Sequence, residues 1–394
     1  MTNPNLHRLP SNNWITASEL NTREEEEIIL FHNKINIRAL VDICMTKREN
    51  AVGCTISERF TCGTENVLKE IVFEDGVIWV ARLPIKKHPP ECIRSEVITM
   101  EYVQSHTTIP IPRVLGYDDT PDNALLNQYI LMEAIYGRTL SKSEDPLLFS
   151  IPDGKVDTVF AQLADVVLQL SSLRFPEIGS LNKDVNGEYY IDDVFGGPGI
   201  GRFKKCSTPA EYFHSIVASK KGIEEKVHRH HKSQIEREAK HKVELASNFK
   251  SSSTSYPLCH TDLRAANILF NDNYKIVAVI DWSYAHSVPI ECMCRVPGGG
   301  FVASKARLSR VGPKWLESVL SRQSKVKKFK AAYVRALEFS ESGRAERKPG
   351  CATEEQLSAI FEGFNARVAT TVFSAHYVHE WEVLELLEEN GDSP

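Results

Sequence analysis

The spacing of apolar residues changes along the chain, and this change predicts which segments form strands and which form helices. Residues 64–83, TENVLKEIVFEDGVIWVARL, contain two runs rich in β-branched and aromatic residues, separated by Asp75 and Gly76. An Asp-Gly pair between two such runs predicts a β-hairpin with a type I′ turn, whose two central positions need positive φ. Downstream, Val97, Met100 and Val103 recur at the spacing of an amphipathic helix, and 127–135, NQYILMEAI, is typical of a buried strand.

The remainder of the chain is predicted to be mostly helical. Residues 155–175 carry apolar side chains at helical spacing, and residues 353–389 predict one or two amphipathic helices with an acidic end. The apolar positions of the first of these helices are Val156, Phe160, Leu163, Val167 and Leu170. We therefore predict a helical leader segment at 1–49, a small β-rich lobe at 50–135 and a larger helical lobe at 136–394.

One charge-rich segment has two possible explanations. Residues 220–250 show little apolar periodicity, which favours a solvated helix or linker. A metal site is the alternative, because the segment contains four histidines, namely His228, His230, His231 and His241.

Composition and charge limit the class of protein. The 394 residues are 42% hydrophobic and 25% charged, as in an ordinary soluble globular protein, and the length favours two lobes. A net charge of -5 argues against nucleic acid as a partner, since phosphate backbones attract basic surfaces. The basic stretch 324–330, SKVKKFK, has one aromatic residue and leaves nucleic-acid binding only as a minor alternative.

The cysteines and the N-terminal sequence predict a compartment. Nine scattered cysteines without a CxxC pair indicate reduced thiols, although Cys292 and Cys294 leave a metal site as an alternative. The N-terminus lacks the apolar core of a signal peptide, and no apolar run reaches the ~18 residues that a membrane span needs. We predict a soluble, cytoplasmic protein without a membrane partner.

Two stretches carry residues suited to phosphate chemistry. Residues 259–270 read CHTDLRAANILF, and residues 275–282 read KIVAVIDW. Asp262 can accept a proton from a hydroxyl group, while Asn267 and Asp281 offer the oxygen ligands that Mg²⁺ prefers. The apolar runs 268–270 and 276–280 predict a hairpin beside this loop. In the alternative interpretation, Asp262 caps a helix and Asn267 closes a turn.

The order of these motifs resembles the HRDxxxxN loop and the later metal-binding Asp of protein kinases, in the variant forms HTDLRAAN and IDW. It is most similar to the aminoglycoside phosphotransferase and choline kinase family, especially its fungal members, over about residues 50 to 290. The resemblance implies an α+β, bilobal protein-kinase-like fold with ATP and Mg²⁺ as cofactors. It implies that Asp262 is the catalytic base or orienter and that His260 supports the geometry of the catalytic loop. Asn267 and Asp281 would bind the metal.

The same resemblance assigns residues of the first lobe to nucleotide binding. Arg82 stands where kinases have a lysine, and Glu96 would pair with it, Glu101 being the less favoured partner. An arginine can bind two phosphate oxygens at once. The residues of the phosphate loop would be Gly63, Thr64 and Asn66, and the main chain of Glu133 and Ala134 would bind adenine.

The predicted reaction is the ATP-dependent transfer of phosphate to a hydroxyl of a small-molecule metabolite, as by a kinase with an alcohol acceptor. No APE-like ending follows Asp281, which favours a small molecule over a protein as the acceptor. The glycine-rich string 195–203 lacks the preceding strand of a phosphate loop, so we expect an irregular loop near the acceptor. Three acidic residues, Glu380, Glu382 and Glu385, lie either on a solvated helix face or near a cationic acceptor. The alternative function is a catalytically inactive nucleotide-binding scaffold.

Overall fold

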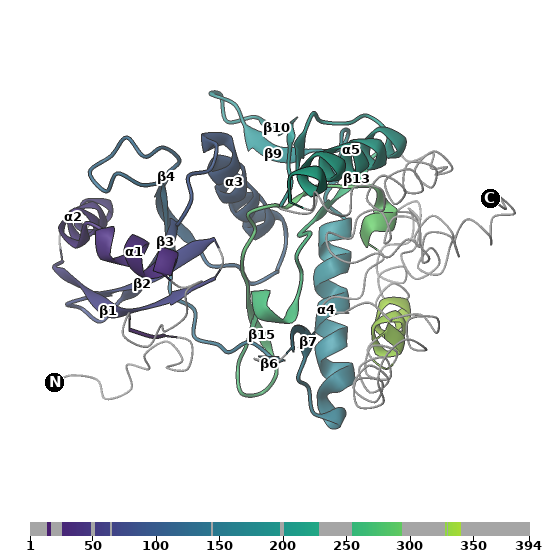
Figure 1. Ribbon diagram of the computed structural model, residues 1–394. Helices are drawn as coiled ribbons and strands as arrows, with labels where there is room; N and C mark the ends of the chain where they lie inside the picture. Colours follow the sequence, from purple (N-terminus) through teal and green to yellow (C-terminus); the bar gives the residue numbers. More distant parts are fainter. Residues whose placement is uncertain are drawn as a thin grey trace, which may run out of the picture. The chain divides into compact units, whose positions relative to one another are not determined.

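The structure is a computed structural model that describes residues 14–16, 26–48, 52–63, 65–142, 145–197, 201–227, 254–293, 328 and 330–339. The chain forms two compact units (Figure 1). Unit 1 comprises Met1–Thr139 and Ile268–Ser283, and unit 2 comprises Leu140–Asn267 and Tyr284–Pro394. The predicted segments 1–49, 50–135 and 136–394 stay a prediction.

A five-stranded sheet forms the centre of unit 1, and every pair of neighbouring strands is antiparallel. The strand order is β1-β2-β3-β5-β4. The strands are β1 (Cys54–Cys62), β2 (Asn66–Phe73), β3 (Ile78–Pro84), β4 (Val114–Asp118) and β5 (Tyr129–Glu133). The hairpin of β2 and β3 and the buried strand β5 confirm the corresponding predictions.

The turn between β2 and β3 differs from the predicted type I′ turn. It is closed by a hydrogen bond of 2.9 Å from the Gly76 N–H to the Phe73 carbonyl, and Gly76 has a φ of 86°. Asp75 does not have positive φ; its carboxylate accepts the Val77 N–H at 3.2 Å instead. The prediction of the turn type is wrong because the loop is longer than two residues and places a single residue in the left-handed region.

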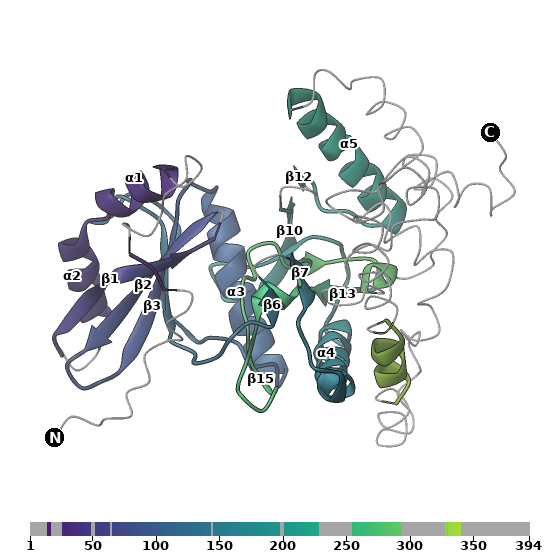
Figure 2. The same ribbon diagram turned by 60° about the horizontal axis from the view of Figure 1, so that its bottom comes forward.

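Helices cover both faces of this sheet (Figure 2). The side chains of each strand alternate between these faces, so the period of two decides which of them each helix meets. On one face, α1 (Glu26–Lys34) and α2 (Ile37–Lys47) pack with Ala81 and Leu83 of β3. On the other face, α3 (Pro90–His106) packs on Ile130 of β5. Arg82 lies between Ala81 and Leu83 in the chain, so it points to the face opposite α1 and α2.

Helix α3 follows the predicted apolar spacing. Val97, Met100 and Val103 are all buried, and each such burial contributes about 1.5–3 kcal/mol. The helix begins at Pro90, earlier than the apolar pattern alone indicated, because proline fits the first helical turn, where its missing N–H has no partner to lose.

Unit 2 is built around α4 (Val156–Ser171), whose five predicted apolar positions are buried. Strand β13 (Tyr256–Cys259) lies between β8 (Arg174–Phe175) and β16 (His286–Ser287). The remaining described strands of unit 2 form two-stranded pairs. Two further helices belong to this unit, α5 (Pro209–Val227) and a helix at 330–339. These strands are β6 (Ser141–Lys142) with β7 (Asp145–Phe149), β9 (Ser180–Lys183) with β10 (Tyr189–Asp192), and β11 (Val194–Phe195) with β12 (Arg202–Phe203). In the described part of unit 2, the short 3-10 helices are η4 (Asp153–Lys155), η6 (Ala265–Asn267) and η7 (Ile290–Met293).

A hairpin late in the sequence returns to unit 1. Strands β14 (Ile268–Phe270) and β15 (Ile276–Val279) pair antiparallel, with Ile268 opposite Val279. The Val279 N–H also bonds the Pro110 carbonyl at 2.8 Å. This hairpin confirms the prediction for 268–280, and the fold is α+β with a β-rich N-terminal part, as predicted.

The described residues also test the predictions about cysteines and membranes. All seven cysteines in these ranges are free thiols. No helix within them is long and apolar enough to cross a bilayer, and they contain no cluster of three or more His, Cys, Asp and Glu side chains that could hold a metal. The predicted helices at 353–389, the histidines at 228–241 and Cys294 lie outside the described residues.

Candidate functional site

In unit 1, the site begins with a buried ion pair. Arg82 of β3 and Glu96 of α3 are only 7% and 3% exposed. Both guanidinium nitrogens, Nη1 and Nη2, donate to the two carboxylate oxygens of Glu96. The structure therefore joins the two residues that the sequence paired, while Glu101 is exposed on the same helix. A bidentate ion pair of this kind fixes the plane of the guanidinium group as well as its position.

Burial shapes the electrostatics of this pair. It raises the pKa of Glu96 above its usual range, although the adjacent Arg82 charge and its hydrogen bonds act in the opposite direction. The carboxylate of Asp281, also in unit 1, raises the pKa further. The ionised form of Glu96 depends at this depth on the Arg82 charge, since an isolated buried carboxylate is strongly disfavoured.

A serine that the sequence analysis missed connects this pair to Asp281. The Ser283 hydroxyl accepts a hydrogen bond from Arg82 Nη1 at 3.2 Å and donates one to Asp281 Oδ1 at 2.9 Å. Asp281 is exposed and has a φ of 66°, whereas the next residue, Trp282, is fully buried and donates from Nε1 to the Val279 carbonyl at 3.0 Å. The buried indole thus holds the turn that leaves the Asp281 carboxylate at the surface. Only the position of Ser283 two residues after Asp281 could have indicated its role.

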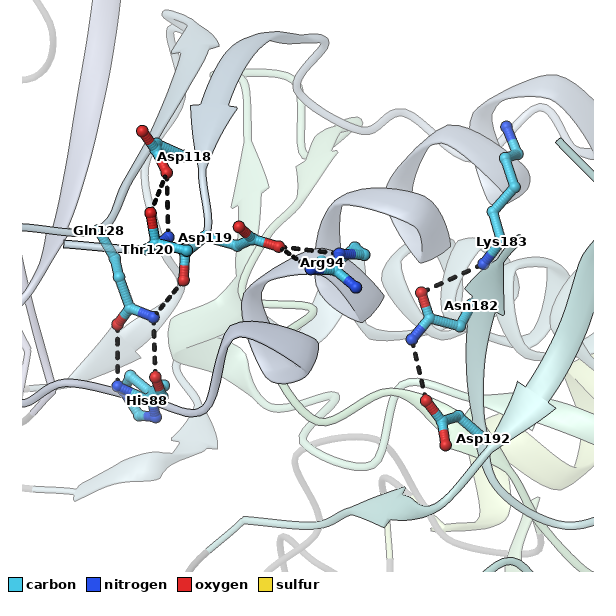
Figure 3. A network of polar contacts seen from close by, with 9 residues as sticks. All are labelled: His88, Arg94, Asp118, Asp119, Thr120, Gln128, Asn182, Lys183 and Asp192. Carbon is cyan, nitrogen blue, oxygen red and sulfur yellow. Dashed lines mark hydrogen bonds and ion pairs between the residues drawn. The ribbon is translucent and has the colours of Figure 1, made fainter. Parts of the chain in front are cut away.

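The start of α3 and the linker before it are held by a second set of polar contacts in unit 1 (Figure 3). Arg94 donates from Nε to Asp119 at 2.8 Å. The fully buried Gln128 accepts the His88 N–H at 2.9 Å and donates to the carbonyls of His88 and Asp119 at 2.8 and 2.7 Å. Arg94 lies two residues before Glu96, so these contacts fix the helical turn that presents Glu96.

In unit 2, the loop 260–267 follows β13 and presents Asp262. His260 is 2% exposed, whereas the Asp262 side chain is 46% exposed. Asp262 Oδ2 accepts hydrogen bonds from Asn267 Nδ2 at 2.8 Å and from Arg264 Nε at 2.9 Å. Within the described part of the chain, the other carboxylate oxygen, Oδ1, has no donor. Arg264 was missed in the sequence, although it stands inside the quoted motif.

The hydrogen bonds of Asn267 determine how its amide is oriented. Nδ2 donates to Asp262 Oδ2 and also to the Asp262 carbonyl at 2.9 Å. Because both partners are acceptors, the amide oxygen must point elsewhere. Asn267 and Asp281 thus each present an oxygen, the donor type that fits Mg²⁺. In the chain, Asn267 directly precedes Ile268 of β14, and Asp281 follows Val279 of β15 by two residues.

The predicted phosphate loop is described only in part, because Thr64 lies outside the described residues. Gly63 donates its N–H to the Asn66 carbonyl at 3.1 Å, and a Cβ at this position would meet nothing within 4 Å. Its φ is not in the left-handed region, so the local backbone does not require glycine. Asn66 Oδ1 is buried and has no partner among the described residues.

The predicted adenine contacts at Glu133 and Ala134 are partly occupied by the protein itself. The Glu133 N–H bonds the Arg113 carbonyl at 3.0 Å, and the Ala134 N–H bonds the Ile78 carbonyl at 3.3 Å. The N–H groups of Ile135 and Tyr136, which sequence analysis did not select, have no acceptor within the described ranges. The N–H groups of Glu133 and Ala134 are therefore both engaged within unit 1.

The glycine-rich string 195–203 belongs to unit 2 and runs from the end of β11 to the end of β12. The prediction that no strand precedes it is wrong, because β11 ends at Phe195. Gly196 N–H bonds the Gly201 carbonyl, and Gly201 N–H bonds the Gly197 carbonyl, both at 2.9 Å. Gly201 has a φ of 77°, which explains a glycine there. Residues 198–200 and the acidic residues at 380–385 lie outside the described residues.

Comparison with known proteins yields a family and several relatives. A family profile described as "Phosphotransferase enzyme family" matches residues 60–292, more than half of the chain. A subtelomeric hrmA-associated cluster protein of Aspergillus fumigatus is 31% identical over 126 residues, which are 30% of this chain and 24% of that protein. The "Altered inheritance of mitochondria protein 9, mitochondrial" of Meyerozyma guilliermondii is 35% identical over 107 residues, 27% of this chain and 17% of that protein. The chain thus spans at most about a quarter of the length of these relatives.

Solved structures show weaker likeness. The aminoglycoside phosphotransferase APH(4)-Ia is 15% identical with a TM-score of 0.46, covering 89% of this chain and 98% of that chain. The macrolide 2′-phosphotransferase MphH from Brachybacterium faecium is 14% identical with a TM-score of 0.38, covering 86% of this chain and 99% of that chain.

The comparisons also correct one prediction. The cytoplasmic location predicted from the sequence is wrong, because relatives from Meyerozyma guilliermondii and Debaryomyces hansenii, 35% and 31% identical over the matched segments, are named as mitochondrial proteins. Reduced cysteines distinguish a secreted protein from an internal one, but they do not separate one reducing compartment from another.

Proposed function

Because this chain belongs to the phosphotransferase enzyme family, whose profile matches residues 60–292, we propose that it transfers the terminal phosphate of ATP to a hydroxyl group of a small molecule. The observation that carries this proposal is the arrangement at Asp262. One carboxylate oxygen is held by Asn267 and Arg264, and the other is left for an incoming hydroxyl. A half-exposed carboxylate held in one orientation is suited to accept a hydroxyl proton or to orient the hydroxyl for attack.

The buried pair in unit 1 supports the role of Arg82 as the cation for the nucleotide phosphates. Arginine carries five N–H donors, so pairing with Glu96 orients the guanidinium group without exhausting its donors. Glu96 would act through Arg82 and not touch the nucleotide. The N–H groups of Ile135 and Tyr136 are the main-chain donors that we assign to the base, in place of the Ala134 N–H, which is bonded within the protein.

Two residues, Asn267 of unit 2 and Asp281 of unit 1, each carry an oxygen of the kind that Mg²⁺ binds. Asn267 has its amide nitrogen committed to Asp262, and Asp281 has one oxygen bonded by Ser283, so each retains an oxygen for a cation. When bound, Mg²⁺ would neutralise negative charge on the phosphates. The protein's own part is to keep Asp262 oriented beside Asn267, which remains possible whether or not the ion is present.

Calorimetry with the full chain tests the nucleotide part of this proposal. ATP and GTP are titrated with and without Mg²⁺ into the wild type, Asp281→Ala and the control Asp272→Ala. Asp272 lies in the turn of the same hairpin, and its side chain is fully exposed. We expect magnesium-dependent binding that falls at least ~10-fold in Asp281→Ala and is unchanged in the control. No nucleotide binding by the wild type would favour the inactive scaffold instead.

A metabolite screen tests the transfer itself. The wild type with ATP and Mg²⁺ is offered a library of hydroxylated small molecules, and ADP release is measured for each. A hit must be lost in Asp262→Asn, since that variant lacks the carboxylate base. Turnover that survives this substitution would contradict the proposed role of Asp262.

We also propose a mitochondrial location, which rests on the names of the relatives from Meyerozyma guilliermondii and Debaryomyces hansenii. Cell fractionation with an antibody against the full chain tests this proposal, and recovery outside the mitochondrial fraction would overturn it.

A further inference from the structure

The residue before Asp262 has an unusual backbone conformation. Thr261 has a φ of 60°, in the left-handed region that β-branched residues rarely adopt. A hydrogen bond of 2.7 Å from the Asp262 N–H to the His260 carbonyl closes a three-residue turn centred on Thr261. Three-residue turns with positive φ at the centre are the rare and strained kind. A strained backbone persists only where the surrounding structure holds it, and such positions gather at functional sites.

The hydroxyl of Thr261 is one of the groups that hold this turn. It donates to the Tyr284 carbonyl at 3.2 Å, and the Thr261 N–H donates to the Cys259 sulfur at 3.4 Å. All of these residues belong to unit 2. Glycine would adopt the same φ without steric strain, so a threonine here is explained by its hydroxyl and not by its backbone preference.

The Tyr284 carbonyl is itself held by a buried histidine. His286 is fully buried and bonds this carbonyl through Nδ1 at 2.8 Å. A carbonyl only accepts, so Nδ1 carries the proton and Nε2 is the acceptor for the Tyr212 hydroxyl, 2.7 Å away. Burial lowers the pKa of His286 to about 4, which keeps the ring in this neutral form at neutral pH. The contacts therefore run from Tyr212 on α5 through His286 and the Tyr284 carbonyl to Thr261.

The aromatic ring of Tyr284 approaches a second element of unit 2. A Cβ added at Gly197, in the turn between β11 and β12, would lie 2.9 Å from Cδ2 of this ring. The glycine therefore allows a close approach, and the Tyr284 residue is fixed both through its carbonyl and through its side chain.

We propose that Thr261 is a positioning residue for Asp262, and that its hydroxyl, anchored through the Tyr284 carbonyl to His286 and Tyr212, holds the strained turn that aims the Asp262 carboxylate. The consequence for catalysis rests on the proposed phosphotransfer function. The consequence for the loop does not, because it concerns only the conformation of residues 260–267.

Hydrogen–deuterium exchange and thermal unfolding of the full chain test the conformational part. In Thr261→Gly, we expect the melting temperature to rise by roughly 2–4 °C, because the strain is relieved. The amides of 262–267 should at the same time exchange about 10-fold faster, because the anchor is lost. A residue with a purely structural role would not combine higher stability with a looser loop.

Two further variants separate the hydroxyl from the shape of the side chain. Thr261→Ser keeps the hydroxyl and should exchange as the wild type does, whereas Thr261→Val keeps the branched shape and should exchange about 10-fold faster. Tyr212→Phe removes the far end of the contacts and should also speed exchange in 262–267. Its matched control is Tyr256→Phe, another buried tyrosine, whose hydroxyl donates to the Ser207 carbonyl at 2.7 Å.

The outcomes distinguish this inference from the proposed function. If Thr261→Val and Thr261→Gly leave loop exchange unchanged, the inference is overturned, even if the wild type transfers phosphate. If exchange changes as expected but the wild type transfers no phosphate, the proposed function fails and the anchored turn stands. If both hold, Thr261→Gly should lower turnover about 10-fold with nucleotide affinity unchanged, and Thr261→Ser should restore it; a rate equal to the wild type in Thr261→Gly would overturn the positioning role.

Discussion

The two candidate regions hold their charged residues in opposite ways. In unit 1, Arg82 and Glu96 are almost completely buried and neutralise one another through two hydrogen bonds. In unit 2, Asp262 is half exposed and owes its orientation to a short loop with a strained residue at Thr261. The first region depends on charge pairing in a low-dielectric environment, and the second depends on backbone geometry. Removing Glu96 from the first region should therefore lower the free energy of unfolding, whereas removing the Asp262 carboxylate from the second should lower activity and leave folding intact.

The largest expected effect is on turnover in unit 2. Asp262→Asn should reduce phosphate transfer by a factor of about 10²–10⁴, the usual contribution of a general base. Folding should be unchanged because the side chain is half exposed. Steady-state ADP release with an acceptor from the screen measures the loss. Asp157→Asn, at an exposed aspartate of α4, is the control, and equal rates in both variants would contradict the comparison.

In unit 1, Glu96→Gln should lower the free energy of unfolding by about 3–5 kcal/mol, because it leaves the buried Arg82 charge without its partner. Urea denaturation measures this change. Glu101→Gln on the exposed side of the same helix should stay within ~0.5 kcal/mol. A cost below ~1 kcal/mol for Glu96→Gln would show that the pair is not the buried charge pair on which the comparison depends.

The two regions should also differ in the sign of their pH dependence. The pKa of His286 is lowered from 6.5 to about 4, so the unfolded chain binds the proton first. The contribution of the neutral His286 ring to the free energy of unfolding is complete above pH 6.5. It is lost as the pH falls toward 4, by ~3 kcal/mol in total. The pKa of Glu96 is raised, so its contribution runs the other way and diminishes as the pH rises above the usual range of a glutamate.

Unfolding measured between pH 4.5 and 7 checks this contrast. The wild type should lose stability toward acid more steeply than His286→Gln, and His106→Gln, at an exposed histidine of α3, should retain the slope of the wild type. A slope in His286→Gln equal to that of the wild type would assign the acid sensitivity to other groups.

The smallest effects should come from glycines. Gly63→Ala should change the free energy of unfolding by no more than ~0.5 kcal/mol, since a Cβ there meets nothing within 4 Å. Gly179→Ala in unit 2 would place a Cβ 2.1 Å from the Asp192 carbonyl oxygen and should cost about 1–3 kcal/mol. Thermal unfolding of both variants makes the test. A large cost for Gly63→Ala would mean that the loop requires glycine after all.

Much of the fold was predictable because apolar periodicity records which face of an element is buried. Helix α3, helix α4 and the hairpin β14–β15 all lie where the sequence placed them. The type of the turn at Gly76 was not predictable, because it depends on how many residues leave the strand pairing. A dipeptide alone does not determine that number.

The candidate site was predictable only at residues that stand in a recognisable order. Asp262 and Asn267 lie in hydrogen-bond contact, and so do Arg82 and Glu96. Ser283 and Thr261 could not be selected from the sequence. A hydroxyl residue has no distinctive spacing, and nothing in the sequence indicates that a threonine has positive φ. Likewise, the engaged N–H of Ala134 follows from strand pairing with Ile78 and not from its side chain.

The hairpin β14–β15 gives unit 1 an unusual dependence on chain order. Its residues 268–283 belong to a unit whose other residues precede position 140, so the whole of 140–267 is synthesised between the two pieces. A ribosome must therefore reach residue 283 before unit 1 holds all its parts, and Asp281 and Ser283 are among the last of them. During translation the five-stranded sheet would form first, and Arg82 would gain its hydrogen bond to Ser283 only later.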